Sequence, residues 1–308
     1  MITADVISLS CDLYEKQATV YRNRDIAPRA AVLYFHGGGL LYGSREDLPD
    51  LHLQILTDAG FSVIAFDYPL APAAKLPVIF SDVCASIETY LASPALFYAT
   101  SQTCGMSADA AAAGPYPLPY FLWGRSAGAY LCLLATGKGN LSQPPAGILS
   151  WYGYGFLTDH WYCSPSPDYC RLPRVDASCV DQALRDADTN GISASGDLEH
   201  HYNLYIYARQ NGAWRDLIYE GREKFFFRDY TLRLCDNLSA PVFAVHSMND
   251  PDVPFAECRA LCDAFGIARP FIIPGKEHDF DRNPDHPYTE RVLKESAAFL
   301  TRCLSAAG

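Results

Sequence analysis

The sequence lacks the features of a membrane-spanning protein and of a secreted protein. It has no run of about 18 uninterrupted apolar residues, the length of a membrane-spanning helix. Its first residues, Met-Ile-Thr-Ala-Asp-Val, have no basic group and no long apolar segment, so they do not resemble a signal peptide. We therefore expect a cytoplasmic location.

Basic clusters and closely spaced cysteine pairs are also missing. Lys and Arg number 24 against 35 Asp and Glu, which gives a formal net charge of −11. Such a charge disfavours contact with nucleic-acid phosphates and with anionic membranes. None of the 11 cysteines forms a Cys-x-x-Cys pair, and most lie in apolar or helical runs. We therefore expect no nucleic-acid or membrane partner, no metal site and a reducing compartment.

The most informative segment that is present is residues 124–128, which read Gly-Arg-Ser-Ala-Gly. The apolar residues 120–123 before it predict a buried strand, and residues 129–135 after it predict a helix. A serine between two glycines at a strand-to-helix turn is typical of a nucleophile elbow, which exposes the hydroxyl at the edge of a sheet. The five-residue pattern also occurs by chance, so its context decides. Ser126 is the candidate nucleophile.

A glycine loop earlier in the chain provides that context. Residues 36–39 read His-Gly-Gly-Gly and follow a second apolar run, residues 31–35. Consecutive glycines keep their N–H groups accessible and let the backbone curl around an anion. Such a loop and the residue after the nucleophile together build the oxyanion hole of an elbow enzyme. We predict Gly37, Gly38 and Ala127 as its donors; the alternative is a flexible turn.

A serine hydroxyl becomes nucleophilic only when a base accepts its proton. Among the eight histidines, His278 lies on a loop beyond a late predicted strand, residues 269–274. Without Ser126 it would be interpreted as a solvated loop residue. His246 lies inside an apolar strand, and we expect it to be structural. His278 is therefore the candidate base.

The acid that orients the base should lie between the nucleophile and the base, after a strand. Asp250 fits, because it lies in the exit loop of the predicted strand 242–246. Asp252 is the alternative, but it directly precedes the start of the next predicted helix. We expect Asp252 to face solvent or to cap that helix, and we prefer Asp250 as the acid.

Together these motifs resemble those of the α/β-hydrolase superfamily, and in particular carboxylesterases of the hormone-sensitive-lipase-like kind. The resemblance implies that Asp250, the first aspartate of an Asp-x-x-Val-Pro loop, is the triad acid. In the places of the common Asp-Tyr-Arg-Leu-Ala-Pro-Glu motif, Pro69 and Ala73 replace the arginine and the glutamate. These departures concern the subfamily and the substrate rather than the chemistry. The matching segments are residues 36–39, 66–72, 124–128, 250–254 and 275–280.

The alternation of predicted strands and helices favours an α/β fold with a doubly wound, mostly parallel sheet, which the resemblance identifies as the α/β-hydrolase fold. Residues 1–151 and 239–308 form the predicted core. Residues 152–238 interrupt the alternation and are rich in aromatic side chains, so we interpret them as a helical cap, or lid, over the serine. Short helices are expected in the cap at residues 200–210 and 214–222, and a surface loop is expected at residues 100–118.

The predicted reaction is hydrolysis of a small soluble carboxylic ester through an acyl-enzyme, with no metal or organic cofactor. Short-acyl, acetyl and aromatic-acyl esters are the expected substrates. Tyr42, Arg125 and the cap residue Tyr154 are candidates for substrate contacts. Tyr42 could equally anchor its loop, and for any single aromatic residue of the cap, such as Tyr154, packing is the preferred interpretation. An amide or peptide hydrolase of the aminopeptidase or formamidase type is the alternative, because it would use the same triad. A non-catalytic binding protein is disfavoured, because all three triad candidates are present.

Overall fold

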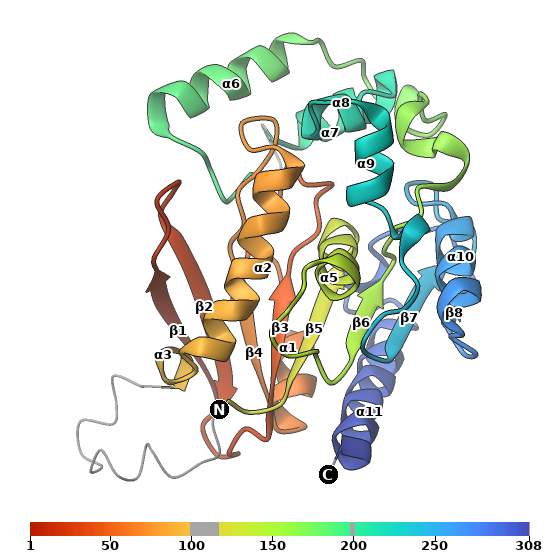
Figure 1. Cartoon of the computed structure of the whole chain (residues 1–308). Coiled ribbons are helices and arrows are strands. Elements are labelled where there is room, and N and C mark those ends of the chain that lie inside the picture. The colour runs from red at the N-terminus through yellow and green to blue at the C-terminus, as the bar shows by residue number, and fades with distance from the viewer. Residues whose placement is uncertain (99–116, 198–200, 308) are drawn as a thin grey trace.

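A computed structural model describes residues 1–98, 117–197 and 201–307. Most of the expected loop at residues 100–118 lies outside the described residues. The described chain folds as an eight-stranded sheet with helices on both faces and a helical segment beyond one end (Figure 1). This arrangement confirms the predicted α/β fold class.

The sheet combines an antiparallel hairpin with a parallel block. The first two strands pair antiparallel, β2 also pairs antiparallel with β4, and the others pair in parallel. The spatial order is β1-β2-β4-β3-β5-β6-β7-β8. The strands are β1 (Ile2–Leu9), β2 (Lys16–Asn23), β3 (Ala30–Phe35), β4 (Phe61–Phe66), β5 (Tyr120–Arg125), β6 (Ile148–Trp151), β7 (Val242–Ser247) and β8 (Phe271–Ile273).

Burial on both faces explains why the central strands are continuous apolar runs. Every residue of β3, β4 and β5 is buried, as expected for parallel strands covered by helices on each side. The apolar side chains divide into two clusters, one on each face of the sheet. One face packs against α1 (Asp50–Asp58) and α11 (Thr289–Ala307), and the other packs against α2 (Leu76–Ala92), α5 (Ala127–Lys138) and α10 (Phe255–Phe265). The short helix α3 (Ala95–Tyr98) follows α2.

The segment between β6 and β7 forms a cap beyond the carboxyl ends of the parallel strands, and α6 is its outermost helix (Figure 1). The predicted helix 214–222 is wrong in its extent: it ends at Ile218, and Gly221 has a positive φ of 144° that a helix does not accept. The cap elements are η1 (Thr158–Cys163), η2 (Tyr169–Arg171), α6 (Ser178–Asn190), α7 (His201–Asn211), α8 (Trp214–Ile218), α9 (Glu223–Asp229) and η3 (Leu232–Leu234). His200, at the start of the first expected cap helix, lies outside the described residues.

Two buried contacts fasten the cap to the core. The carboxylate of Glu257, on α10, accepts the backbone N–H groups of residues 155–158 at 2.5–3.1 Å. The indole N–H of Trp214 donates to the carbonyl oxygen of Gly39 at 2.8 Å. Both contacts satisfy polar groups that would be costly to bury alone. These contacts therefore hold residues 155–158 of the cap to α10 of the core, and α8 of the cap to the glycine loop.

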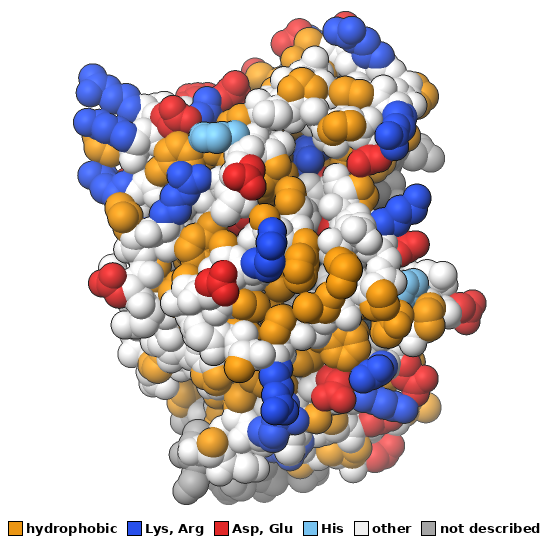
Figure 2. Space-filling view, turned by 90° about the vertical axis from the view of Figure 1, so that its right-hand side faces the viewer, with side chains coloured by type: hydrophobic (Ala, Val, Ile, Leu, Met, Phe, Trp, Pro, Cys, Tyr) orange, Lys and Arg blue, Asp and Glu red, His pale blue; other side chains and the backbone are white. Residues whose placement is uncertain are grey.

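The edge of the sheet at β8 forms part of the molecular surface. Figure 2 shows this side of the molecule, with hydrophobic side chains gathered across its middle between charged ones. On β8 itself, Ile272 is exposed. No helix in the described part of the chain is both long and apolar enough to cross a membrane.

Candidate active site

Ser126 stands at a sharp turn between β5 and α5. Its backbone has φ 51° and ψ −116°, a left-handed conformation that is costly for a residue with a side chain. A Cβ at Gly124 would overlap the backbone of Gly128, and a Cβ at Gly128 would overlap the carbonyl oxygen of Phe35. Gly124 therefore lets β5 and α5 approach closely, and Gly128 lets α5 approach the end of β3.

Ser126, His278 and Asp250 form one hydrogen-bonded line. The Oγ of Ser126 lies 2.9 Å from Nε2 of His278, and Nδ1 of His278 lies 2.7 Å from Oδ2 of Asp250. Since a carboxylate only accepts, Nδ1 carries the proton, and Nε2 of the neutral ring can accept from the hydroxyl. His278 follows β8 and Asp250 follows β7, so both residues reach the carboxyl end of the sheet beside the elbow.

The loop after β7 holds the Asp250 carboxylate from its other side. Its Oδ1 accepts the backbone N–H groups of Asp252 at 2.8 Å and of Val253 at 3.0 Å. Burial acts to raise the pKa of Asp250, but the charge and hydrogen bond of His278 outweigh it, so this pKa is lowered. The carboxylate is therefore charged at neutral pH and fixed in one orientation.

The pKa of His278 shifts in the opposite direction. Burial disfavours the imidazolium, yet the nearby carboxylates of Asp250 and Asp252 outweigh burial and raise the pKa of His278 to about 9. The ring lies edge-on to Tyr152, with a distance of 4.8 Å between the ring centroids. His278 therefore gains a proton easily, which suits a base that must carry positive charge during a reaction.

The glycine loop wraps around the hydroxyl of Ser126. Gly38 and Gly39 have positive φ angles of 96° and 61°. A Cβ on Gly38 would overlap the backbone of Tyr42, and a Cβ on Gly39 would overlap the ring of Tyr205. A Cβ on Gly37 would lie 3.4 Å from that of Ser126. Within the described residues, no acceptor is placed for the N–H groups of Gly37 and Gly38.

The third predicted donor comes from the elbow itself. Ala127 is the first residue of α5, so its N–H has no acceptor within the helix. Its partial positive charge lies at the helix N-terminus, where an anion is favoured. Two of the three predicted N–H donors thus lie in the glycine loop, and the third lies at the start of α5.

A narrow pocket lies over the serine. Its volume is about 20 Å³, roughly the space that one water molecule needs. Tyr42 lines this pocket, and Tyr205 from the cap closes it. Tyr154 lies elsewhere: it is buried in the core beneath the cap, stacked on Tyr130 at 4.8 Å. Of the predicted substrate contacts, the structure thus places Tyr42 at the pocket and Tyr154 away from it.

Arg125 also borders the pocket, but its guanidinium is occupied by protein groups. Its Nε donates to the hydroxyl of Tyr34 at 2.8 Å, Nη1 pairs with Asp281 at 2.8 Å, and Nη2 pairs with Asp47 at 2.7 Å. Burial acts to lower the pKa of Arg125, but the surrounding groups, led by Asp47, outweigh burial, so this pKa is raised. Arg125 therefore ties the elbow to the loop that carries His278, as a buried anchor beneath the site.

Our prediction for the position of Asp252 was wrong. We expected it to face solvent or to cap α10, but it is buried and lines the pocket. Its Oδ1 lies 2.6 Å from Nη1 of Arg209 and 2.7 Å from the hydroxyl of Tyr205, both on α7 of the cap. The reason is charge pairing: a buried arginine on the cap needs a buried carboxylate opposite it. The Asp-x-Asp spacing was the only sequence signal for this role.

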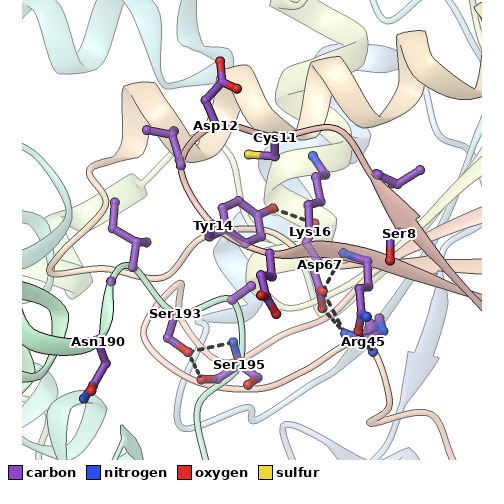
Figure 3. Close-up of a pocket in the computed structure, with 17 residues that line it drawn as sticks. Ser8, Cys11, Asp12, Tyr14, Lys16, Arg45, Asp67, Asn190, Ser193 and Ser195 are labelled. Atoms are coloured by element: carbon purple, nitrogen blue, oxygen red, sulfur yellow. Dashed lines mark hydrogen bonds and ion pairs between the residues drawn. The ribbon is translucent and has the colours of Figure 1, made fainter.

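A larger pocket shares no lining residue with the one over Ser126. It has a volume of about 1000 Å³ and lies between the loop that joins β1 to β2 and the cap residues 190–195. Figure 3 shows two contacts within it: Arg45 pairs with Asp67 at 2.7 Å, and the Ser193 hydroxyl donates to the backbone carbonyl oxygen of Ser195. Its described lining residues include no histidine.

No group of three or more His, Cys, Asp or Glu side chains in the described ranges is arranged to hold a metal ion. Two of the other histidines, His36 and His246, make contacts within the protein core. His36 is buried under Tyr68, and burial lowers the pKa of His36 to about 4. His246, predicted to be structural, lies 2.9 Å from the carbonyl oxygen of Val253, which places it behind the acid loop.

Comparisons with known proteins agree with this geometry. A family model described as the alpha/beta hydrolase fold matches residues 32–217, more than half of the chain. The chain therefore belongs to the α/β-hydrolase family, which confirms the predicted resemblance to its hormone-sensitive-lipase-like members.

Curated relatives match only in part. The non-reducing polyketide synthase adrD of Penicillium rubens is 28% identical over 163 residues, which make up 50% of this chain and 6% of the synthase. The ethyl acetate hydrolase of Pseudomonas putida is 43% identical over 53 residues, 17% of each chain. The matched segments thus span a small fraction of these relatives.

Solved structures share the whole fold. A Staphylococcus aureus protein described as having unknown function superposes with a TM-score of 0.75 at 22% identity, covering 98% of this chain and 99% of the other. A hyperthermophilic esterase from Pyrobaculum calidifontis gives a TM-score of 0.65 at 18% identity, covering 97% of this chain and 82% of the esterase. At such identities the likeness concerns the fold alone.

Proposed function

We propose that this chain is a serine hydrolase of the carboxylesterase type, which cleaves esters of small substrates through an acyl-enzyme. The observation that carries the proposal is the hydrogen-bonded line from Ser126 through His278 to Asp250. A hydroxyl, an imidazole and a carboxylate in this order supply a nucleophile, a base and an orienting acid. The names of the Pseudomonas hydrolase and the Pyrobaculum esterase support the same class.

The reaction proceeds in two halves. In the first, Ser126 Oγ attacks the carbonyl carbon while His278 Nε2 takes the hydroxyl proton. The tetrahedral intermediate then collapses, and the alcohol leaves with that proton. In the second half, water attacks the acyl-enzyme, gives a proton to Nε2, and the acid is released with Ser126 restored. Asp250 holds the ring and stabilises its positive charge.

The negative oxygen of each intermediate needs donors that are fixed in advance. We expect the N–H groups of Gly37, Gly38 and Ala127 to fill this role, because the glycine loop lies against Ser126 and Ala127 begins α5 directly after it. The narrow pocket favours a small acyl group such as acetyl or another short chain. We therefore expect turnover to fall as the acyl chain lengthens.

The experiment is a panel of p-nitrophenyl esters from acetate to octanoate, run with wild type and Ser126→Ala. We expect wild type to prefer the short esters, and Ser126→Ala to lose about 10⁶-fold in kcat, as triad serines do. A fluorophosphonate probe should label wild type at Ser126. Ser81→Ala, on the exposed surface of α2, is the matched control.

Two results would contradict the proposal. Activity that survives in Ser126→Ala would remove the serine from the reaction. Rates on aminoacyl anilides that exceed those on esters would instead favour the amide-hydrolase alternative with the same three residues.

A further inference from the structure

A second carboxylate lies beside the nitrogen of His278 that faces the serine. Oδ2 of Asp252 is 3.7 Å from Nε2, and the Asp252 side chain is only 8% exposed. This Nε2 is the atom that exchanges a proton with Ser126. Asp250, in contrast, contacts the other ring nitrogen. His278 is therefore flanked by carboxylates on both of its nitrogens.

The cap holds this second carboxylate in place. Arg209 Nη1 contacts both Oδ1 and the backbone carbonyl oxygen of Asp252, at 2.6 and 3.0 Å. The hydroxyl of Tyr205 donates to the same Oδ1 at 2.7 Å. Arg209 is itself buried, and its guanidinium lies over the Trp161 and Tyr169 rings at 4.9 and 5.3 Å. One carboxylate oxygen is thus bound to the cap, and the other is directed at the base.

We propose that Asp252 is a positioning residue for the base, and that the cap, through Arg209 and Tyr205, sets how strongly Asp252 acts on His278 and hence the pH range of activity. The inference rests on the proposed role of His278 as the base. An arginine that shares the charge of Asp252 weakens its pull on the imidazolium. A carboxylate without that partner would hold the proton on Nε2 more firmly.

The other charged and titratable groups around this pair come from several elements. On the core side, Asp252 adds to the effect of Asp250 in raising the pKa of His278, and Asp279 adds a smaller effect. Since the base must be neutral to act, activity rises as pH passes through that pKa. Three further charged groups line the pocket with His278 and Asp252: Arg282, which pairs with Asp279 at 2.8 Å, and Arg125 and Asp47, which pair with each other at 2.7 Å. Other titratable groups that interact with His278 or Asp252 are His246, Tyr152, Tyr42, Tyr154, Tyr169 and Tyr202.

The test is the pH profile of kcat/KM for p-nitrophenyl acetate, corrected for spontaneous hydrolysis. Asp252→Asn should move the acidic limb about 1 pH unit toward lower pH, because an opposite charge within this distance is lost. Arg209→Gln should move it the opposite way. Tyr205→Phe, which removes a single hydrogen bond, should give a smaller shift in the direction of Arg209→Gln, and it covers the case in which the arginine variant does not fold. Asp263→Asn, exposed on α10, is the control.

A second readout separates this inference from the proposed function. The NMR titration of the His278 ring gives its pKa without turnover, so it applies even if wild type does not cleave the ester. Opposite shifts for the aspartate and the cap variants support the inference. An unmoved limb and an unmoved titration in Asp252→Asn would overturn it, even if Ser126→Ala is inactive. Shifts of the same sign in all variants would show a purely structural role and would overturn it as well.

Discussion

The molecule contains two histidine–aspartate pairs with nearly equal distances between the ring nitrogen and the carboxylate oxygen. His278 and Asp250 are 2.7 Å apart, and His52 and Asp281 are 2.8 Å apart. All four side chains are largely buried. Only the first pair has a serine hydroxyl on the far nitrogen of its ring. The pairing of imidazole and carboxylate therefore does not by itself mark a catalytic site.

The neighbours of each pair decide its role. His278 is surrounded by carboxylates, and its pKa is raised to about 9. His52 shares its aspartate with a buried arginine and a tyrosine: Asp281 also binds Arg125 at 2.8 Å and Tyr152 at 2.6 Å. Burial is the largest influence on His52 and lowers its pKa. Only the surroundings of the first pair favour a positive ring.

The second pair nevertheless supports the first. Arg125 directly precedes Ser126, and Asp281 follows His278 by three residues. Their ion pair therefore joins the turn at Ser126 to the loop that carries His278. Burial acts to raise the pKa of Asp281, but Arg125 and His52 hold it well below its usual range. Removing a charge from either pair should thus have different consequences.

The largest expected effect is on activity, and it concerns Asp250 of the first pair. Asp250→Asn should lower kcat by about 10⁴-fold, because an amide that donates to Nδ1 favours the wrong tautomer of the ring. The kinetics on p-nitrophenyl acetate measure this loss. Asp252→Asn is the comparison: if it costs more than Asp250→Asn at the pH optimum of each variant, then Asp252 is the acid of the triad.

The next largest effect is on stability, and it concerns Asp281 of the second pair. Asp281→Asn should lower the free energy of unfolding by about 3–5 kcal/mol, because the buried Arg125 loses a charge partner. Urea unfolding measures the change, and Asp285→Asn, on the exposed loop nearby, is the control. The folded fraction should keep far more activity than Asp250→Asn. A loss of activity as large as that of Asp250→Asn, at unchanged stability, would place Asp281 in the chemistry.

The smallest effect concerns how stability depends on pH. The folded-state pKa of His278 is raised, so its contribution is full below the unfolded value of about 6.5 and is lost as pH rises through about 9. The pKa of His52 is lowered, so stability declines as pH falls below about 6.5.

Unfolding curves from pH 5 to 10 test these signs. His278→Gln should flatten the alkaline decline, by ~1–3 kcal/mol across the range. His52→Gln should flatten part of the acidic decline, while the buried His36 and His246 retain the rest. The comparison fails if both variants flatten the same side.

Local patterns carried most of what the sequence could predict. Ser126 and the glycine loop each follow a continuous apolar strand, and their short motifs require particular backbone conformations. In the structure His278 contacts Ser126 and Asp250 contacts His278, and both His278 and Asp250 follow late strands. The α/β fold class and the family were also predictable from the same patterns.

Contacts between distant segments could not be predicted in the same way. Arg209 and Asp252 are 43 residues apart, and Arg125 and Asp281 are 156 apart, with no local pattern that couples them. Their pairing depends on which buried charges face each other after the chain has folded. The cap was predicted from its aromatic content, but its helix ends depend on loop glycines such as Gly221 and on tertiary contacts.

The contact between Ser126 and His278 also has a consequence for protein synthesis. It joins residues that are 152 positions apart in the sequence. As the chain leaves the ribosome, the elbow and the glycine loop are made long before the strand that delivers the histidine, and long-range contacts of this kind form late. A nascent chain that ends before β8 therefore contains Ser126 and the glycine loop, but it lacks the histidine that contacts the serine.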